Sequence, residues 1–136
     1  MRYMLDTNIC IHLIERRPPQ VMARFEALSQ GDVVMSVVTF AELRDGVERE
    51  PRHKAAAQRA LTMLQGFIPV MPFDTDAALR YGELAAAVPQ RRKDALDRLI
   101  AAHALSLGVV LVTNNEADFK GYPGVRVENW VKGPPP

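Results

Sequence analysis

The sequence lacks the features that mark several classes of protein. It has one cysteine, Cys10, in 136 residues, so no disulfide can form within the chain. It also lacks an excess of charge of either sign, because 17 Lys and Arg residues balance 16 Asp and Glu residues to a formal net charge of +1. A disulfide-stapled fold and an overall field that attracts polyanions are therefore both excluded. Any contact with nucleic acid must depend on local patches of charge.

Long apolar runs and internal repeats are missing as well. The first residues contain neither a signal-peptide core nor a segment long enough to cross a bilayer, so we expect a cytoplasmic protein that makes no membrane contact. Hydrophobic residues make up 48% and charged residues 24%, which is ordinary for a chain that folds on its own. The length suits one domain, expected over residues 1–132 and followed by a flexible tail at 133–136.

Short apolar runs alternate with helical patterns along the chain. Uninterrupted apolar strands between helices indicate a three-layer α/β/α sandwich with a central parallel sheet, because a half-exposed sheet would show alternating polarity. Gly108 follows the last helix, where a residue with positive φ is favoured. The pattern predicts strands at 2–5, 33–36 and 109–112, extended pieces at 67–73 and 125–129, and helices at 9–17, 19–28, 37–48, 53–64, 76–88 and 94–107.

Acidic residues follow the predicted strands, where ligands bind to parallel sheets. Asp6 follows the first strand, Glu42 lies one turn into the helix after the second, and Asp118 follows strand 109–112. Asp97 lies near the start of helix 94–107. At roughly 100° per residue, the apolar stripe of that helix holds Leu96, Ile100, His103 and Leu107. Asp97 borders this stripe, whereas Asp94 faces water.

Each acid also has a purely structural interpretation. Asp6 can cap the helix that follows it, and Thr39 with Glu42 matches the S/T-x-x-E capping box. Asp97 can complement a helix dipole, and Asp118 can be an ordinary loop carboxylate. The topology nevertheless brings these acids to one end of one sheet, where their mutual repulsion would require a cation between them.

Oxygen ligands without thiolates or paired imidazoles favour Mg²⁺ or Mn²⁺, which can activate water and clamp a phosphate. This chemistry indicates phosphodiester hydrolysis. His12, His53 and His103 show no zinc-ligand spacing, and His103 on the apolar stripe is expected to be a core residue with its polar atoms satisfied. Cys10 is expected to be a small buried hydrophobe.

Five blocks of the sequence, in order and nearly from end to end, resemble the PIN-domain ribonucleases, and within them the VapC-type toxins of bacterial toxin–antitoxin pairs. The resemblance implies a Mg²⁺- or Mn²⁺-dependent endoribonuclease whose target is RNA, often a tRNA, with the anticodon stem-loop of initiator tRNA as the most specific expectation. It also implies a cognate antitoxin that blocks the acidic site, homodimers within a larger assembly, and contact with operator DNA through the antitoxin. The blocks are MLDTNICIHLI, MSVVTFAELRDGVE, DRLIAAHALSLG, LVTNNEADF and GVRVENW.

The resemblance also assigns site residues. It implies that Asp6, Glu42 and Asp97 are catalytic acids, with Asp6 and Asp97 as metal ligands. Many relatives carry a fourth acid at the position of Asn115, and here Asp118 can replace it. The segment before Asp97 departs from the family pattern, which leaves Asp94 as a competitor for the third acid. Polar neighbours expected to orient ligands or water are Thr7, Asn8, Thr113, Asn114 and Asn115, and basic residues that could grip RNA phosphates are Arg91, Arg92 and Lys93.

Two other functions fit part of the sequence. A phosphatase of the haloacid dehalogenase type also begins with an Asp after its first strand, but its D-x-D-x-T pattern needs an acid where this chain has Asn8. A catalytically silent module that binds a protein partner would explain the missing acid at Asn115. Binding of Mn²⁺ that depends on Asp6 and Asp97 would distinguish the enzyme from the silent module.

Overall fold

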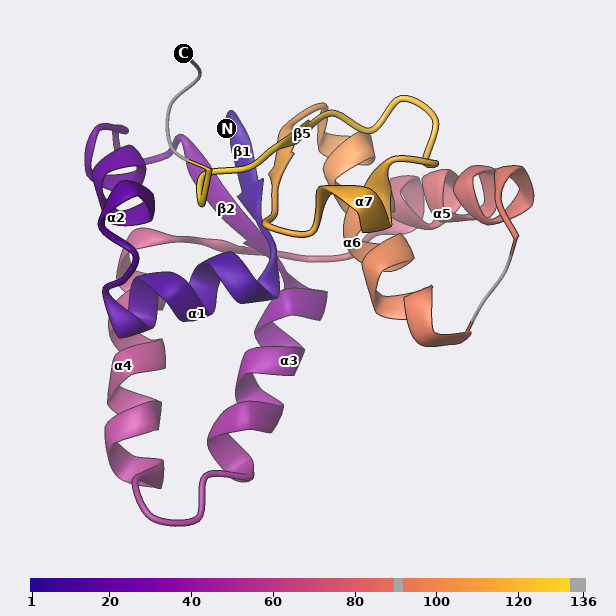
Figure 1. Cartoon of the computed structure of the whole chain (residues 1–136). Helices are drawn as coiled ribbons and strands as arrows, with labels where there is room; N and C mark the ends of the chain where they lie inside the picture. The colour runs from indigo at the N-terminus through magenta and orange to yellow at the C-terminus, as the bar shows by residue number, and fades with distance from the viewer. Residues whose placement is uncertain (90–91, 133–136) are drawn as a thin grey trace.

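A parallel five-stranded sheet forms the centre of the molecule. The computed structural model describes residues 1–89 and 92–132 (Figure 1). The strands lie in the order β3-β2-β1-β4-β5, and all four strand pairs are parallel. Their bounds are β1 Tyr3–Leu5, β2 Val33–Ser36, β3 Val70–Met71, β4 Val110–Val112 and β5 Val127–Glu128.

Helices connect the strands, and most follow the predicted pattern. The first begins at Thr7, two residues before the predicted start, because Asp6 caps it. A four-residue helix at Glu116–Phe119 was not predicted, since one turn is too short to show a period. The predicted tail at 133–136 lies outside the described residues. The helices are α1 Thr7–Glu15, α2 Pro19–Glu26, α3 Val37–Glu48, α4 Lys54–Phe67, α5 Thr75–Ala87, α6 Ala95–Leu107 and α7 Glu116–Phe119, with a 3-10 turn, η1, at Arg92–Asp94.

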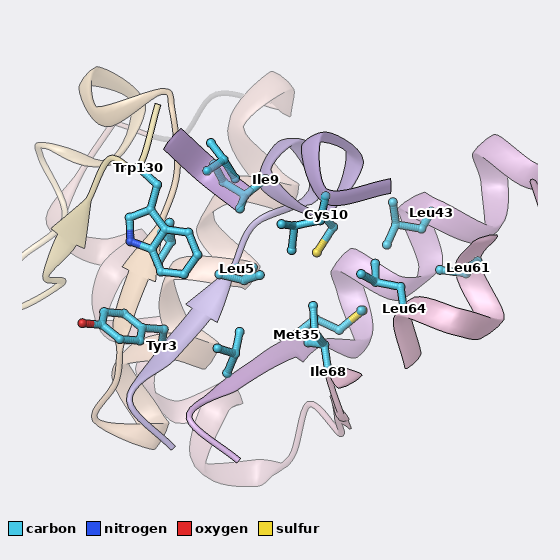
Figure 2. Packing of buried hydrophobic residues seen from close by; sticks show 14 of the residues in the cluster. Tyr3, Leu5, Ile9, Cys10, Met35, Leu43, Leu61, Leu64, Ile68 and Trp130 are labelled. Atoms are coloured by element: carbon cyan, nitrogen blue, oxygen red, sulfur yellow. The ribbon is translucent and has the colours of Figure 1, made fainter. Parts of the chain in front are cut away.

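Both faces of the sheet are buried, because successive strand residues point to opposite sides. Tyr3 and Leu5 of β1 belong to one apolar cluster, which α1, α2, α3 and α4 cover. Figure 2 shows this cluster around Leu5, with Trp130 packed against Tyr3. Met4 points to the other cluster, which α5, α6 and α7 cover. The three-layer α/β/α fold is thus confirmed, and none of the described helices is long and apolar enough to span a membrane.

The C-terminal segment is fixed to α2 through Trp130. Its indole nitrogen donates a hydrogen bond of 3.0 Å to Glu128, and the guanidinium of Arg24 lies 5.4 Å from the ring centre. Arg24 also forms an ion pair with Glu128. Gln20 donates to the carbonyl of Val131 over 2.7 Å. These contacts hold edge strand β5 beside β4 and so complete the sheet.

The strand order places a topological switch point at the carboxyl edge of the sheet, between β1 and β4. The chain moves outward from β1 to β2 and β3, then returns to place β4 on the other side of β1. Connections from β1 and β4 therefore diverge at that point, as in other open parallel sheets that bind ligands there. The first residues beyond these two strands are Asp6 and Thr113.

Gly108 ends α6 with φ +67°, and it confirms the predicted helix stop. We predict that Gly108→Ala lowers the free energy of unfolding by about 1 kcal/mol, because a Cβ is disfavoured in the left-handed region. The matched control is Gly46→Ala in the interior of α3, where the added Cβ also meets nothing within 4 Å. That change should raise stability by about 0.5–1 kcal/mol. Urea denaturation measures both, and equal effects of the two changes would contradict this account.

Candidate active site

Asp6 lies at the carboxyl edge of the sheet, directly after β1, and the residue is only 6% exposed. Its carboxylate accepts a 3.0 Å hydrogen bond from the backbone N–H of Ile9, so the capping interpretation of this residue is correct. Burial raises the pKa of Asp6, and the nearby Glu42 carboxylate raises it further, while hydrogen bonds from the Thr113 hydroxyl and Ile9 lower it. Capping and membership of an acidic cluster thus coexist in one residue.

Glu42 reaches the same region from α3. Its carboxylate accepts a 2.6 Å hydrogen bond from the hydroxyl of Thr7, a residue 35 positions away. The capping-box interpretation of Thr39 and Glu42 is wrong, because α3 begins at Val37 and Ser36 is its N-cap. Thr39 instead lies buried in the first turn. The Thr7 hydroxyl therefore fixes Glu42 beside Asp6.

Asp97 is partly buried in the first turn of α6. Burial raises the pKa of Asp97 to about 6, and the carboxylates of Asp118, Asp6, Glu42 and Asp94 add to the shift in that order. Three acids from distant parts of the chain, together with the neighbouring Asp94, thus lie within electrostatic reach of Asp97. The cause nearest in sequence, Asp94, is the weakest of them.

Two details of the helical phase argument differ from the structure. Leu96, assigned to the buried stripe of α6, is 47% exposed. It belongs to the first turn, whereas the fully buried run of the helix begins at Ile100. Asp94, expected to face water, is partly buried in η1.

The segment after β4 carries the remaining candidates. Thr113 is fully buried, and its hydroxyl accepts a 3.0 Å hydrogen bond from the backbone N–H of Asn115. The Oδ1 atom of Asn114 is buried and has no hydrogen-bond partner within the described part of the chain. Asp118 is exposed in α7, and its carboxylate is the strongest charged influence on Asp97. The side chain of Asn115 is exposed.

The other predicted residues lie around this cluster. Asn8 is exposed in the first turn of α1. Arg92 and Lys93 are exposed in η1, shortly before Asp97, while the predicted contact through Arg91 lies outside the described residues. The sequence analysis missed Ser36, which hydrogen-bonds His103 inside the protein. No local pattern signals a contact between residues so far apart.

The cluster does not form a closed metal cage. In residues 1–89 and 92–132, no three His, Cys, Asp or Glu side chains lie close enough together to hold one ion by themselves. Two carboxylates would leave room for water and amide oxygens in the coordination shell. Such an open, oxygen-only shell suits Mg²⁺, which keeps several of its waters.

Comparisons with known proteins identify the family. Residues 3–125 match the PIN domain. This chain belongs to the PIN-domain family. Within it, the chain is 36% identical over 135 residues to the tRNA(fMet)-specific endonuclease VapC of Salmonella typhimurium, covering 96% of this chain and 98% of that protein. It is also 34% identical over 136 residues to ribonuclease VapC2 of Haemophilus influenzae, covering 96% and 99%.

Solved structures agree with this assignment. The chain resembles VapBC2 from Rickettsia felis bound to a promoter DNA fragment, with a TM-score of 0.84, 32% identity, and coverage of 96% of this chain and 99% of that one. DNA-bound VapBC from Salmonella typhimurium gives a TM-score of 0.78 at 36% identity, covering 96% and 98%. The chain is therefore a VapC-type ribonuclease toxin, and the haloacid dehalogenase alternative is wrong.

Repulsion within the cluster generates a pH-dependent stability. The folded pKa of Asp97, about 6, exceeds its ordinary 3.8, so the folded state favours the protonated acid and loses stability as the pH rises between those values. We predict that Asp97→Asn stabilises the metal-free protein at pH 7 by about 1 kcal/mol, after allowance for solvent screening, and that this gain shrinks toward zero below pH 4.

Urea denaturation of both proteins across this pH range measures the difference. Glu26→Gln, which neutralises an exposed acid on α2, is the control and should show no such pH dependence. A constant gap between the Asp97→Asn and parent proteins at every pH would contradict the proposed repulsion.

Proposed function

We propose that this protein hydrolyses RNA phosphodiester bonds with Mg²⁺ or Mn²⁺, using the acidic cluster at the carboxyl edge of the sheet. The observation that supports this proposal is the raised pKa of Asp97, to which Asp118, Asp6 and Glu42 all contribute. Carboxylates that are kept together despite their repulsion fit a site for a divalent cation. The tRNA(fMet)-specific endonucleases among the relatives favour initiator tRNA as the substrate, with the anticodon stem-loop as the cleavage region.

Asp6 and Asp97 are the residues that would hold the ion. A bound divalent cation would lower the pKa of a water molecule and balance charge on the phosphate. Asp6 is held in place by the N–H of Ile9 and the hydroxyl of Thr113, which restrict the orientation of its carboxylate. The buried, unpartnered Oδ1 of Asn114 adds a neutral oxygen to this region.

The remaining acids orient the reactants. The hydroxyl of Thr7 leaves one oxygen of Glu42 free to accept a proton or to orient water. Asp118 lies at the exposed rim, beside the path by which a large substrate must enter. Arg92 and Lys93, next to Asp97 in the chain, can bind flanking phosphates, and their contribution should weaken as salt rises. We also assign an orienting role to Asn8 and Asn115.

Removing either ligand should abolish cleavage. We predict that Asp6→Asn and Asp97→Asn each reduce the rate of cleavage of cellular tRNA with Mg²⁺ by about a hundredfold or more, because a neutral amide cannot replace the charge at the cation. Mapping of new 5′ ends measures the rate and the cleavage site. Glu26→Gln should cleave like the parent, and parental cleavage by either site variant would defeat the proposal.

Asp118 and Asn115 can be separated by a matched pair of changes, since both side chains are exposed. We predict that Asp118→Asn reduces the cleavage rate about tenfold, because it removes the strongest charged neighbour of Asp97. Asn115→Ala should change the rate less than twofold to threefold. The same cleavage assay distinguishes them. A larger loss of rate from Asn115→Ala than from Asp118→Asn would indicate that Asn115, and not Asp118, takes the place of the fourth acid of the family.

We further propose that a cognate antitoxin covers the toxin. An apolar groove lies between α1, α2 and α4, where Met63 is 68% exposed and Phe67 is 60% exposed. An apolar segment of the antitoxin fits this groove, and a basic residue on that segment would pair with the acids of the site. Related proteins have been solved as toxin–antitoxin complexes, two of them with DNA. Homodimerisation, and contact with operator DNA through the antitoxin, belong to the same proposal. The residues that line the groove are Leu13, Ile14, Arg16, Met22, Phe25, Ala60, Met63, Leu64 and Phe67.

A further inference from the structure

A buried hydrogen bond joins the two helices that carry Glu42 and Asp97. Nδ1 of His103 in α6 lies 2.7 Å from the hydroxyl oxygen of Ser36, the last residue of β2. Both side chains are buried, with exposed fractions of 1% and 0%. The contact spans 67 positions of sequence, so it connects parts of the chain that no local structure holds together.

Each partner of this bond is also tied to one of the acids. The Ser36 hydroxyl caps α3 by accepting a 3.1 Å hydrogen bond from the N–H of Val38, and Glu42 lies in that helix. His103 lies six residues after Asp97 in α6, which corresponds to about 9 Å along the helix axis. The bond is therefore a direct connection between the start of one acid-bearing helix and the body of the other.

The Ser36 hydroxyl accepts the N–H of Val38 and, with a second lone pair and its own hydrogen, can either accept from Nδ1 or donate to it. We assign the hydroxyl as the donor, because the Pro72 carbonyl acts on the ring and favours a proton on Nε2 of the neutral imidazole. Burial lowers the pKa of His103, against opposing effects of the Asp74 carboxylate and the Pro72 carbonyl, which agrees with a neutral ring. Within the described residues, Nε2 has no partner that meets hydrogen-bond geometry. The Pro72 carbonyl therefore influences the pKa of His103 without forming a well-aligned hydrogen bond.

α6 packs extensively against α5, and three of its buried residues, Ala101, Ala102 and Ala104, have small side chains. A hydrogen bond is directional, and breaking it in a buried place leaves a polar group unpaired. The His103–Ser36 bond therefore adds a directional constraint between α6 and the end of β2 to this apolar packing. Phe73 supports the ring through an edge contact, with ring centres 5.4 Å apart.

We propose that His103 is a positioning residue, which sets the distance between Asp97 and Glu42 through its hydrogen bond with Ser36. This inference rests on the proposed function, because the acids must act together for their spacing to matter. A histidine that only fills space in the core would have the same burial. The two roles differ in whether the acceptor atom or the volume of the side chain is needed.

Two replacements separate these roles, because His103→Leu keeps most of the side-chain volume and His103→Asn keeps an acceptor in a smaller side chain. His103→Asn keeps an acceptor, since its Oδ1 takes the place of Nδ1, whereas His103→Leu provides none. We expect His103→Leu to weaken Mn²⁺ binding about tenfold in calorimetry, and to lower kcat for tRNA cleavage about tenfold with little change in KM. His103→Asn should remain within about threefold of the parent in both measurements.

The control is Leu61→Ala, a buried change in α4 within the other apolar cluster. It should lower the unfolding temperature at least as much as His103→Leu and leave Mn²⁺ affinity and kcat unchanged. If His103→Leu does not fold, Ser36→Ala removes the donor instead and should give the same tenfold loss of Mn²⁺ affinity. Where both fold, the double variant should lose no more Mn²⁺ affinity than Ser36→Ala alone, because Ser36→Ala already removes the bond to His103 together with the cap to Val38.

Several results would overturn the inference. Parental Mn²⁺ affinity in His103→Leu would do so. An equal loss in His103→Asn and His103→Leu would show that the acceptor is not needed, and a larger loss in His103→Asn would indicate a space-filling role. A parent protein that binds Mn²⁺ but leaves RNA intact would defeat the proposed function alone, and the Mn²⁺ affinities of the variants would still decide the role of His103. A parent protein that binds no Mn²⁺ would overturn both.

Discussion

Repulsion among carboxylates is the constraint on which the rest of this structure depends. Asp97 carries a pKa of about 6 because it is buried and because Asp118, Asp6 and Glu42 lie near it. Side chains free to move would separate and lower that energy. Asp6 is held by the backbone N–H of Ile9 and the hydroxyl of Thr113, and Glu42 is held by the hydroxyl of Thr7. Burial of apolar side chains in the two cores of the sandwich supplies the free energy that offsets the repulsion among the acids.

The parallel sheet explains why such a cluster can form at all. Strands β1 and β4 lie side by side at the centre, and the residues that follow them emerge at one edge, where backbone connections diverge. Two helices, α3 and α6, then bring Glu42 and Asp97 to that edge from opposite faces. A small change in how these helices lie on the sheet would alter the spacing of the acids. A buried polar contact that holds one of these helices, such as the one between His103 and Ser36, therefore affects the spacing of the acids.

Local signals in the sequence were sufficient for much of the fold. Gly108, the strand at Tyr3–Leu5 and the capping role of Asp6 all follow from residues within one turn or strand. Contacts between residues far apart in the sequence could not be predicted from such local signals. The S/T-x-x-E pattern at Thr39 and Glu42 satisfied a local rule, but Ser36 took the cap and Glu42 instead bonds Thr7, 35 positions away. The identity of His103 predicted burial correctly, yet its partner could not be named. The convergence of Asp6, Glu42 and Asp97 could be predicted from the sequence because strand exits in a parallel sheet converge, a general rule that needs no side-chain contacts.

The most direct test of a cation site built by repelling carboxylates is anomalous diffraction from crystals of this protein grown with Mn²⁺. Such data locate the ion independently of any activity. The account predicts an anomalous peak within bonding distance of carboxylate oxygens of Asp6 and Asp97, at the carboxyl edge of the sheet. A saturating concentration of Mn²⁺ that leaves this edge empty, or a peak bound only by other residues, would contradict it.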